Sequence, residues 1–349
     1  MALLNSTQLG LFDLTKRLDG SGRIVDIAEI AVKQNDIIED LMFVECNDGS
    51  GHKINARMGY PAPTWRELNN GVDFTKSDVQ VLRETCGLMG NMVRVDAKAV
   101  ELAGGGKAAS ARNADEKTAV SNLFAQEIIG VTQGMSDEAA ATIIYGSLAA
   151  DAKKFTGLAP RYSQLTGESA TKQNVLDAVG NAGAANTSIW LVVHGGIGLK
   201  GIYPKNTKAG IQHVQVNNGI PVLTAAPNGG QYLAYVDELS WNLGIALENW
   251  ETCVRIANVD TTKLLTDDAY VKTILKKMVQ ASEIVSKFRM GKACFYMNRL
   301  ARTALRLGYL ERSANTITFD SVAGKQAMQF GEIPVRLCES IINTEAKLT

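Results

Sequence analysis

The sequence predicts an α+β fold, because extended chain precedes one long helix and a compact mixture of helices and strands follows it. The helix is the clearest element. Asn113 can cap its first turn, and Glu116 stands where a capping box places a carboxylate. Glycine commonly ends helices, so we expect the helix to end at Gly134. Apolar residues recur on one face at helical spacing, at Val120, Leu123, Phe124, Ile128 and Val131.

Length and composition are those of an ordinary globular protein. The chain has 349 residues, 46% of them hydrophobic and 21% charged, which allows one large domain or two to three smaller ones. Basic and acidic residues number 36 each, so the whole chain has no net attraction to nucleic acid or anionic membranes. Residues 261–312 carry eleven Lys/Arg against four Asp/Glu. A solvated helix face explains this local bias at least as well as a binding surface.

The five cysteines are scattered, odd in number and never in a C-x-x-C pair, at Cys46, Cys86, Cys253, Cys294 and Cys338. This usage is typical of a reducing compartment, where thiols serve as small core residues. The first residues lack the basic start and apolar run of a signal peptide, and no apolar run is long enough to span a bilayer. We therefore expect a protein made and used in cytosol-like conditions, with no membrane partner.

The first third of the chain contains segments that cannot bury themselves. Residues 1 to about 40 combine a polar-apolar lead with a loose helix-like piece, so another surface must hold them. Between Met42 and Met58, apolar residues alternate on both sides of an Asn-Asp-Gly-Ser-Gly turn, which predicts a β-hairpin. A two-stranded hairpin is marginal in water, so it should rest against another surface. Further strand-like alternation follows at residues 79–95.

The remaining elements follow from caps, breakers and periodicity. Asp96 predicts the cap of a short helix that three glycines at 104–106 end, and these glycines form a flexible joint before the long helix. Thr266, Asp267 and Asp268 suit the positive end of a later helix. Further helices are expected at 136–145, 174–185, 268–288 and before Gly308, and strands at 189–193, 231–237, 240–257, 293–297 and 333–338.

One motif points to cofactor chemistry. Between Gly196 and Gly201 the chain has the pattern G-x-G-x-x-G directly after a predicted strand, as in a dinucleotide-binding loop. That site needs a helix to begin at the last glycine, whereas Pro204 and a turn cluster follow here. The first acid after the loop is Asp237, well beyond the expected spacing. A glycine-rich loop that leaves a core strand is the simpler interpretation, and a nucleotide-dependent enzyme using this loop is the alternative.

Other catalytic or metal-binding patterns are missing. Lys107 follows three glycines, but Ala108 occupies the Ser/Thr place of a P-loop. There is no G-x-S-x-G elbow, and the histidines His52, His194 and His213 lack zinc-ligand spacing. We expect His194, at a strand end, to be a structural histidine with its hydrogen bonds made. The sequence thus assigns no catalytic, cofactor-binding or metal-ligating residue and no cofactor, and it predicts a protein that is not an enzyme.

Six stretches, taken in order along the chain, carry a family resemblance. They are LLNSTQLGLFDLTKRL at 3–18, FTGL at 155–158, GIYPK with KAGI at 201–211, WNLG with RIAN at 241–258, FYMNR at 295–299 and GEIPVR at 331–336. Together they resemble the major capsid proteins of tailed bacteriophages, closest to the epsilon-15-like short-tailed group. The resemblance extends from the first ten residues to the last fifteen.

The resemblance implies the capsid fold of phage Hong Kong 97. Its parts would be an N-terminal arm at 1–40, an extended hairpin loop at 41–75, a peripheral domain with a long spine helix at 76–165, and an axial domain at 166–349. The axial range would include returning peripheral strands at about 231–260. In the prototype such strands come near the end of the chain, so the connectivity can be rearranged here.

The resemblance also implies a function: self-assembly as hexamers and pentamers into an icosahedral phage head that encloses double-stranded DNA. The chain would be located in the virion and assembled in the bacterial host cytoplasm. Its partners would be copies of itself, with a cement protein, a scaffold, a portal and packaged DNA as further candidates. Lys276 and Lys277 are hypothesised to face the genome. Some relatives cross-link through a loop lysine, but Lys53 lies on a predicted hairpin strand and is not given that role.

Overall fold

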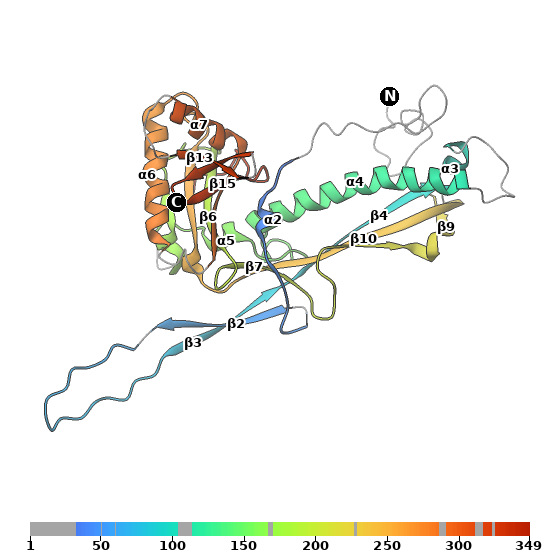
Figure 1. The fold of residues 1–349 in the computed structure, drawn as a ribbon. Helices are drawn as coiled ribbons and strands as arrows, with labels where there is room; N and C mark the ends of the chain where they lie inside the picture. Colours follow the sequence, from blue (N-terminus) through green and yellow to red (C-terminus); the bar gives the residue numbers. More distant parts are fainter. Residues whose placement is uncertain are drawn as a thin grey trace. The chain divides into compact units, whose positions relative to one another are not determined.

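The computed structural model describes residues 33–49, 51–59, 61–103, 114–166, 170–226, 229–285, 291–310, 317–322 and 325–349 (Figure 1). The chain divides into two compact units, each built from separate stretches of sequence. The described parts of the first unit lie within 88–138 and 210–242, and those of the second within 33–87, 139–209 and 243–349. Most of the predicted arm (1–32) and the glycine joint at 104–106 lie outside the described residues.

The first unit combines helices with antiparallel strands. Its sheet is built on the N-terminal part of the long strand β10, with β8 and β9 pairing at different positions along it: His213 lies opposite Leu239, and Leu223 opposite Leu233. The later residues of α4 and β10 belong to the second unit. The elements are β4 (Gly87–Asp96), α3 (Ala97–Ala103), α4 (Ala114–Tyr145), β8 (Ile211–Gln215), η2 (Val216–Gly219), β9 (Val222–Ala225) and β10 (Gln231–Leu247).

The long helix is confirmed, but its predicted end at Gly134 is wrong. α4 continues through this glycine to Tyr145, so the separate helix expected at 136–145 is part of it. A glycine inside a helix costs only about 1 kcal/mol. Beyond it, Ala139 and Ile143 are fully buried, and this packing outweighs the local cost. The Asp96 cap of α3 is also confirmed, because its Oδ1 accepts a hydrogen bond from the backbone N of Lys98 at 2.7 Å.

The second unit is organised around a mixed sheet. β6 pairs antiparallel with β11 on one side and with β12 on the other, and β12 continues the sheet to β15 in parallel. The strands are β1 (Phe43–Glu45), β2 (Gly51–Gly59), β3 (Asp78–Thr85), β5 (Val175–Asp177), β6 (Asn186–His194), β7 (Leu199–Tyr203), β11 (Cys253–Asp260), β12 (Lys292–Met297), β13 (Ile317–Val322), β14 (Lys325–Phe330) and β15 (Ile333–Leu337). The helices are α2 (Ile37–Asp40), α5 (Leu158–Arg161), η1 (Ala170–Asn174), η3 (Trp250–Thr252), α6 (Asp268–Ile284) and α7 (Arg299–Leu310).

The core of this unit lies between the sheet and the helices α6 and α7. All nine residues of β6 are buried. The apolar run at 189–193 predicts this for five of them, and the other four are buried polar residues. α6 contributes an apolar stripe that includes Val271, Ile274 and Met278. Its predicted start is confirmed, because the carboxylate of Asp267 accepts hydrogen bonds from the backbone N of Ala269 and Tyr270. The strand predicted at 293–297 is confirmed as β12.

The helix predicted at 174–185 is wrong. The chain there ends η1 and enters β5, which pairs in parallel with β11. Asn174 is buried and donates a hydrogen bond from Nδ2 to the carbonyl of Cys253 at 2.8 Å. A side chain on Gly180 would collide with the backbone of Asn258, so this segment lies against β11 instead of coiling. Pairing with the sheet overrides the helical pattern.

Other boundaries also differ from the prediction. β10 runs unbroken from Gln231 to Leu247, and η3 separates it from β11. α7 continues through Gly308 to Leu310, and the antiparallel pair β13–β14 was not predicted. Of the helix predicted at 268–288, residues 286–288 lie outside the described residues.

The hairpin predicted between residues 42–46 and 54–58 is also wrong in its pairing. The turn exists: Asp48 and Gly51 exchange backbone hydrogen bonds of 3.0 and 2.7 Å. However, β1 pairs in parallel with β7, and β2 pairs antiparallel with β3, placing Ile54 opposite Leu82. Alternating polarity predicts a strand but does not select its partner. Figure 1 shows β2 and β3 as a two-stranded ribbon that ends in a long loop.

Candidate interaction surface

The segment joining β2 to β3, residues 61–77, exposes apolar side chains; we call it the hairpin loop. Every residue from 61 to 76 is exposed. Trp65 is 103% and Phe74 106% exposed, and Leu68 and Val72 are also exposed. Single apolar residues are common on protein surfaces, but four on one short loop, two of them fully exposed aromatics, make the loop a candidate interaction surface.

The sequence explains why the hairpin loop has no regular structure. Pro61 and Pro63 cannot donate backbone hydrogen bonds and favour extended chain. The loop then turns at 67–70, where the backbone N of Asn70 donates to the carbonyl of Glu67 at 3.2 Å. Asn69 adopts a positive φ of 67°, a conformation that asparagine tolerates well.

The root of the hairpin is fixed to the rest of the second unit in two ways. Ile54 is buried in a small apolar cluster with Cys46, Ile202 and Ala246. On β3, the carboxylate of Glu84 receives a bidentate ion pair from Arg161 of α5, with Nη2 to Oε2 at 2.7 Å. Burial disfavours the Arg161 charge, but Glu84 outweighs this effect and raises the pKa of Arg161. The ribbon is therefore anchored at its base and exposed at its end.

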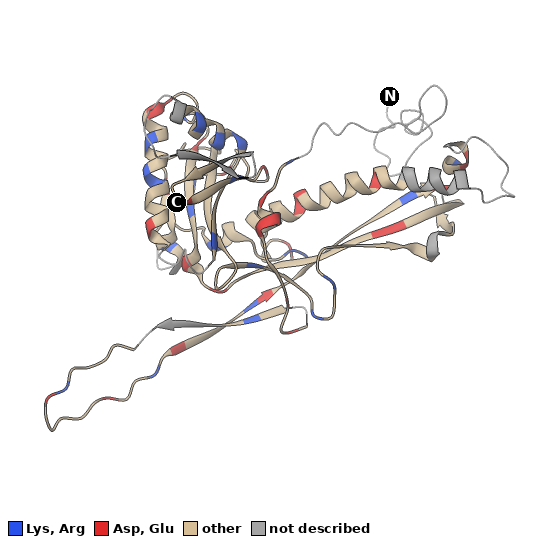
Figure 2. Cartoon of the chain, viewed as in Figure 1, with Lys and Arg blue, Asp and Glu red and all other residues tan. Residues whose placement is uncertain are grey.

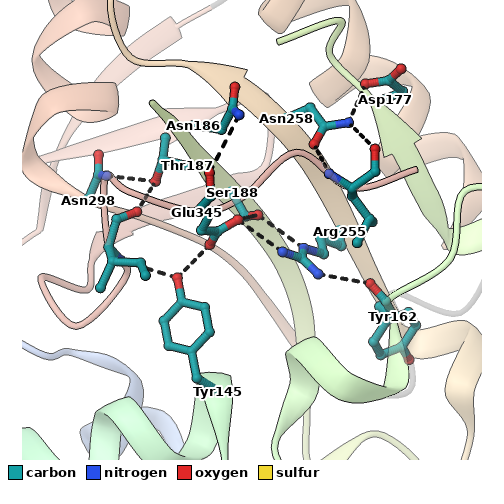
Figure 3. Close-up of polar contacts among 12 residues, drawn as sticks. Tyr145, Tyr162, Asp177, Asn186, Thr187, Ser188, Arg255, Asn258, Asn298 and Glu345 are labelled. Atoms are coloured by element: carbon teal, nitrogen blue, oxygen red, sulfur yellow. Dashed lines mark hydrogen bonds and ion pairs between the residues drawn. The ribbon is translucent and has the colours of Figure 1, made fainter. Parts of the chain in front are cut away.

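A buried polar network holds the C-terminal residues against β6 and β11 (Figure 3). The guanidinium of Arg255 donates from Nη2 to Glu345 Oε2 at 2.9 Å, from Nε to Ser188 Oγ at 3.0 Å, and from Nη1 to the carbonyl of Tyr162 at 3.0 Å. Tyr145 donates from its hydroxyl to the other oxygen of Glu345 at 2.5 Å. Burial, followed by the charge of Glu345, raises the pKa of Tyr145. Ser188 Oγ also donates to Oε2, so both carboxylate oxygens of Glu345 accept hydrogen bonds within the subunit, which indicates a structural role.

Amide side chains extend this network along the C-terminal segment. Asn258 donates from Nδ2 to the carbonyl of Leu348 at 3.0 Å, and its Oδ1 accepts a hydrogen bond from the backbone N of Leu348 at 2.7 Å. Asn298 donates to Thr187 Oγ1 at 2.8 Å and to Asn343 Oδ1 at 2.5 Å. These bonds fix a segment that has no helix or strand after β15.

His194 lies at the end of β6, as predicted, and only one of its two ring nitrogens has a hydrogen-bond partner. Its Nε2 donates to the hydroxyl oxygen of Tyr296 at 2.7 Å, because that hydroxyl in turn donates to Asp40 at 2.6 Å. Nδ1 is buried without a hydrogen-bond partner, so the expectation of a fully bonded histidine is wrong at that atom. Burial lowers the pKa of His194 to about 4, against an opposing effect of Asp40. The imidazole is therefore neutral at pH 7.

The glycine-rich loop between Gly196 and Gly201 does not have the geometry of a dinucleotide site. It leads into strand β7, and no helix begins there to bind a pyrophosphate. Gly195 and Gly196 adopt positive φ angles of 77° and 54°, and Gly201 lies against the ring of Phe43. These glycines serve a tight turn and close strand packing.

The described residues contain no cluster of three or more His, Cys, Asp or Glu side chains that could hold a metal ion. Of the described helices, none has the length and apolar character needed to cross a bilayer.

Comparison with known proteins decides the family. Residues 19–349 match the family model of the major capsid protein GP7. The chain belongs to this family. A chain in a solved structure of bacteriophage Epsilon15 matches this chain over 100% of the length of both, with a TM-score of 0.75 and 28% sequence identity.

Two more distant structures match with lower scores. The capsid of bacteriophage JBD30 gives a TM-score of 0.49 at 7% identity, over 89% of this chain and 93% of that one. An encapsulin complex from Synechococcus elongatus gives 0.38 at 10% identity, over 67% and 93%. No curated protein sequence matches the chain.

The predicted resemblance and fold class are therefore confirmed. This is a structural protein of the bacteriophage virion that assembles with copies of itself into a shell, and its mixed α/β fold is of the Hong Kong 97 type. The apolar side chains of the hairpin loop could have been found from sequence, since Trp65 and Phe74 follow two prolines without helical or strand periodicity. The Arg255–Glu345 network gave no such signal, because its members are far apart in the chain.

Proposed function

We propose that the hairpin loop of this capsid protein docks onto neighbouring copies, which assemble as hexamers and pentamers into an icosahedral head around double-stranded DNA. The exposure of Trp65 and Phe74 is the observation that carries the proposal. Buried aromatic residues commonly anchor protein interfaces. In a closed symmetric assembly of identical chains, each subunit can supply the surface that covers its neighbour's exposed residues.

The free energy gained by burying the hairpin loop does not offset the full range of the cost of association, so other surfaces must contribute to docking. Full burial of a large apolar side chain contributes about 1.5–3 kcal/mol, so Trp65, Leu68 and Phe74 together supply roughly 5–9 kcal/mol. Association costs about 4–15 kcal/mol in lost translational and rotational freedom. Further contacts are therefore needed. Residues 1–40 as an arm, and the exposed Leu223 and Leu233 of the β9–β10 pair, are candidates to supply them.

The division into capsid regions remains our assignment. Residues 1–40 would form the arm, 76–165 the peripheral domain around α4, and 166–349 the axial domain with returning strands at about 231–260. The resemblance implies an extended loop at 41–75, and the pairing of β2 with β3 supports extending it through β3. Chains lacking residues 1–25 are expected to fold but not to close particles. Normal particles from this truncated chain would reject the arm assignment.

The docking proposal is tested with a Trp65→Ser/Phe74→Ser double variant. Both side chains are exposed in the subunit, so its circular dichroism spectrum and unfolding midpoint should match wild type. Electron microscopy should show no closed shells at concentrations where wild type assembles. The Trp65→Phe/Phe74→Leu variant, which keeps apolar side chains, is the matched control and should retain shells. Normal shells from the serine variant would overturn the proposal.

Helix α6 is a candidate surface toward packaged DNA. Lys272 and Lys276 are exposed on it, and Figure 2 shows further basic positions on α7. Basic side chains bind nucleic acid phosphates without sequence preference, and such binding weakens as salt rises. A Lys276→Gln/Lys277→Gln variant should form shells that retain less DNA, with the deficit growing with salt. Unchanged retention would count against this surface.

The remaining partners follow from the same proposal. A scaffold, a portal and a cement protein would act during or after assembly in the host cytoplasm. All five cysteines are unbridged, which suits a reducing compartment. We also infer that the chain is not an enzyme, because the loop at Gly196 lacks a helix for a nucleotide. Tight, saturable binding of NAD or ATP at this loop would contradict that inference.

A further inference from the structure

Two cysteines lie in contact at the root of the hairpin. Cys46 directly follows β1 and Cys86 directly follows β3, and their Sγ atoms are 3.4 Å apart. Cys46 is buried in the apolar cluster with Ile54, Ile202 and Ala246, and Cys86 packs against this cluster while remaining partly accessible. The two residues are forty positions apart, so their contact results from the fold.

We propose that Cys46 and Cys86 form an intramolecular disulfide once the particle leaves the reducing cytoplasm. The sulfur atoms need to approach by about 1.4 Å to reach the bond length of a disulfide. Virion surfaces outside the cell are oxidising environments in which disulfides persist. The timing of this step rests on the proposed cytoplasmic assembly, whereas the chemistry requires only the folded chain.

The oxidant can be a small disulfide such as oxidised glutathione. The Cys86 thiolate, on the more accessible side, attacks one glutathione sulfur, forms a mixed disulfide and releases one glutathione thiolate. The Cys46 thiolate then attacks Sγ of Cys86, the bond to glutathione breaks, and the second glutathione leaves. Two cysteine thiols are thereby oxidised by two electrons, one glutathione disulfide is reduced to two thiols, and protons transfer from the cysteines to the leaving groups.

The cross-link would change the mechanical properties of the hairpin. It would close a covalent ring that contains β2, the hairpin loop and β3, because its ends flank all three. The root of the hairpin would then remain tied to β1, which pairs with β7, even where the loop is strained by a neighbour. Burial raises the pKa of both thiols, so the exchange should accelerate as pH rises.

The other three cysteines provide internal controls. Cys253, Cys294 and Cys338 are each fully buried, whereas Cys86 is partly accessible. Oxidant should therefore reach Cys86 before it reaches these thiols. A bond between Cys46 and Cys86 should leave the three of them reduced.

The first test is chemical. Full-length protein is purified with reductant, exposed to oxidised glutathione at pH 8, unfolded, alkylated and digested for mass spectrometry. The expected result is a peptide pair joined through Cys46 and Cys86, with the other three cysteines alkylated. Cys46→Ala and Cys86→Ala should each abolish the pair, and Cys294→Ala should keep it. A stable glutathione adduct on Cys86, or no linked peptide from oxidised wild type, would overturn the proposal.

The second test needs no variant. Trypsin can cut the exposed hairpin loop at Arg66 or Lys76, between the two cysteines. In oxidised protein the two fragments should migrate together on a denaturing gel until reductant is added, whereas in reduced protein they should separate at once. Separation of the oxidised fragments without reductant would overturn the proposal. Such a failure leaves the docking proposal intact, because that proposal is judged by shell formation in the hairpin-loop variants.

Discussion

The paired strands β6 and β11, which we call the layer, belong to the same unit as the β2–β3 hairpin. The layer buries its tryptophan side chain, whereas the hairpin loop exposes one. Trp190 in β6 is 0% exposed, with its ring edge-on to Tyr162 and 5.1 Å from the Arg255 guanidinium. Trp65 in the hairpin loop is fully exposed. The layer buries its apolar surface and pairs Arg255 with Glu345 of the C-terminal segment, whereas the hairpin loop leaves apolar surface in water.

This difference separates two kinds of energy. Side chains in the layer determine whether the subunit folds, because their contacts exist only in the folded chain. Side chains in the hairpin loop add little to folding, because the folded subunit leaves them as exposed as the unfolded chain does. They are available to stabilise the shell, and substitutions should therefore act on folding in one region and on assembly in the other.

The largest difference in unfolding free energy is expected between two single variants, one with Trp→Ala in the layer and one with Trp→Ala in the hairpin loop. Trp190→Ala removes a buried ring and leaves a cavity, and should cost about 5 kcal/mol of unfolding free energy. Trp65→Ala should change that free energy by less than about 0.5 kcal/mol, because no contact is lost in the subunit. Denaturant titration of both purified subunits provides the measurement. Equal losses would show that the hairpin loop packs within its own subunit.

A second large effect is expected at the buried ion pair. Arg255→Met leaves the Glu345 carboxylate buried without its cation and should cost about 4 kcal/mol. The Arg255→Met/Glu345→Met variant removes both charges and should recover a substantial part of the loss. Both are measured by denaturant titration. If the two substitutions were simply additive, the pair would not be coupled as the geometry indicates.

The pKa of His194 predicts how the unfolding free energy changes as pH falls. The pKa of this imidazole is about 4 in the folded protein against 6.5 for an ordinary histidine, so between these pH values the unfolded chain binds a proton that the folded chain does not. The unfolding free energy should therefore fall by about 3 kcal/mol as pH drops through this window, and the contribution is absent above pH about 6.5.

The control is His194→Gln, which keeps a donor toward Tyr296 but cannot titrate. Its unfolding free energy should decrease less than that of wild type between pH 6.5 and 4, and the difference between the two curves isolates the histidine from the carboxylates. Parallel curves would show that His194 does not govern this response.

The smallest effect is expected for ion pairs on the hairpin. The carboxylate oxygen Oδ2 of Asp48 forms ion pairs with Lys53 Nζ at 3.2 Å and with Arg83 Nε at 3.4 Å, and all three side chains are exposed to solvent. Exposed pairs contribute about 0–1 kcal/mol, so Lys53→Ala should lower the unfolding free energy by less than about 1 kcal/mol, and less in high salt. A loss as large as that at Arg255 would remove the distinction between the two regions.

Local signals in the sequence predicted several helices and buried strands but little of the hairpin. The buried run of β6, the Asp267 cap of α6 and the long helix α4 could be predicted because each depends on neighbouring residues. The partner of β2 could not, since the alternation around Ile54 suits either a near or a distant strand. The expected helix at 174–185 failed for the same reason, because pairing with β11 is a tertiary contact.

The sequence by itself determined the family, the long helix α4, the start of α6 and the buried strands β6 and β12. Only the tertiary structure decided that Arg255 meets Glu345, that Cys46 meets Cys86, and that Trp65 remains in water. The physical reason is range. Caps and periodicity act over a few residues along the chain, whereas ion pairs, thiol contacts and exposure depend on which distant surfaces pack together.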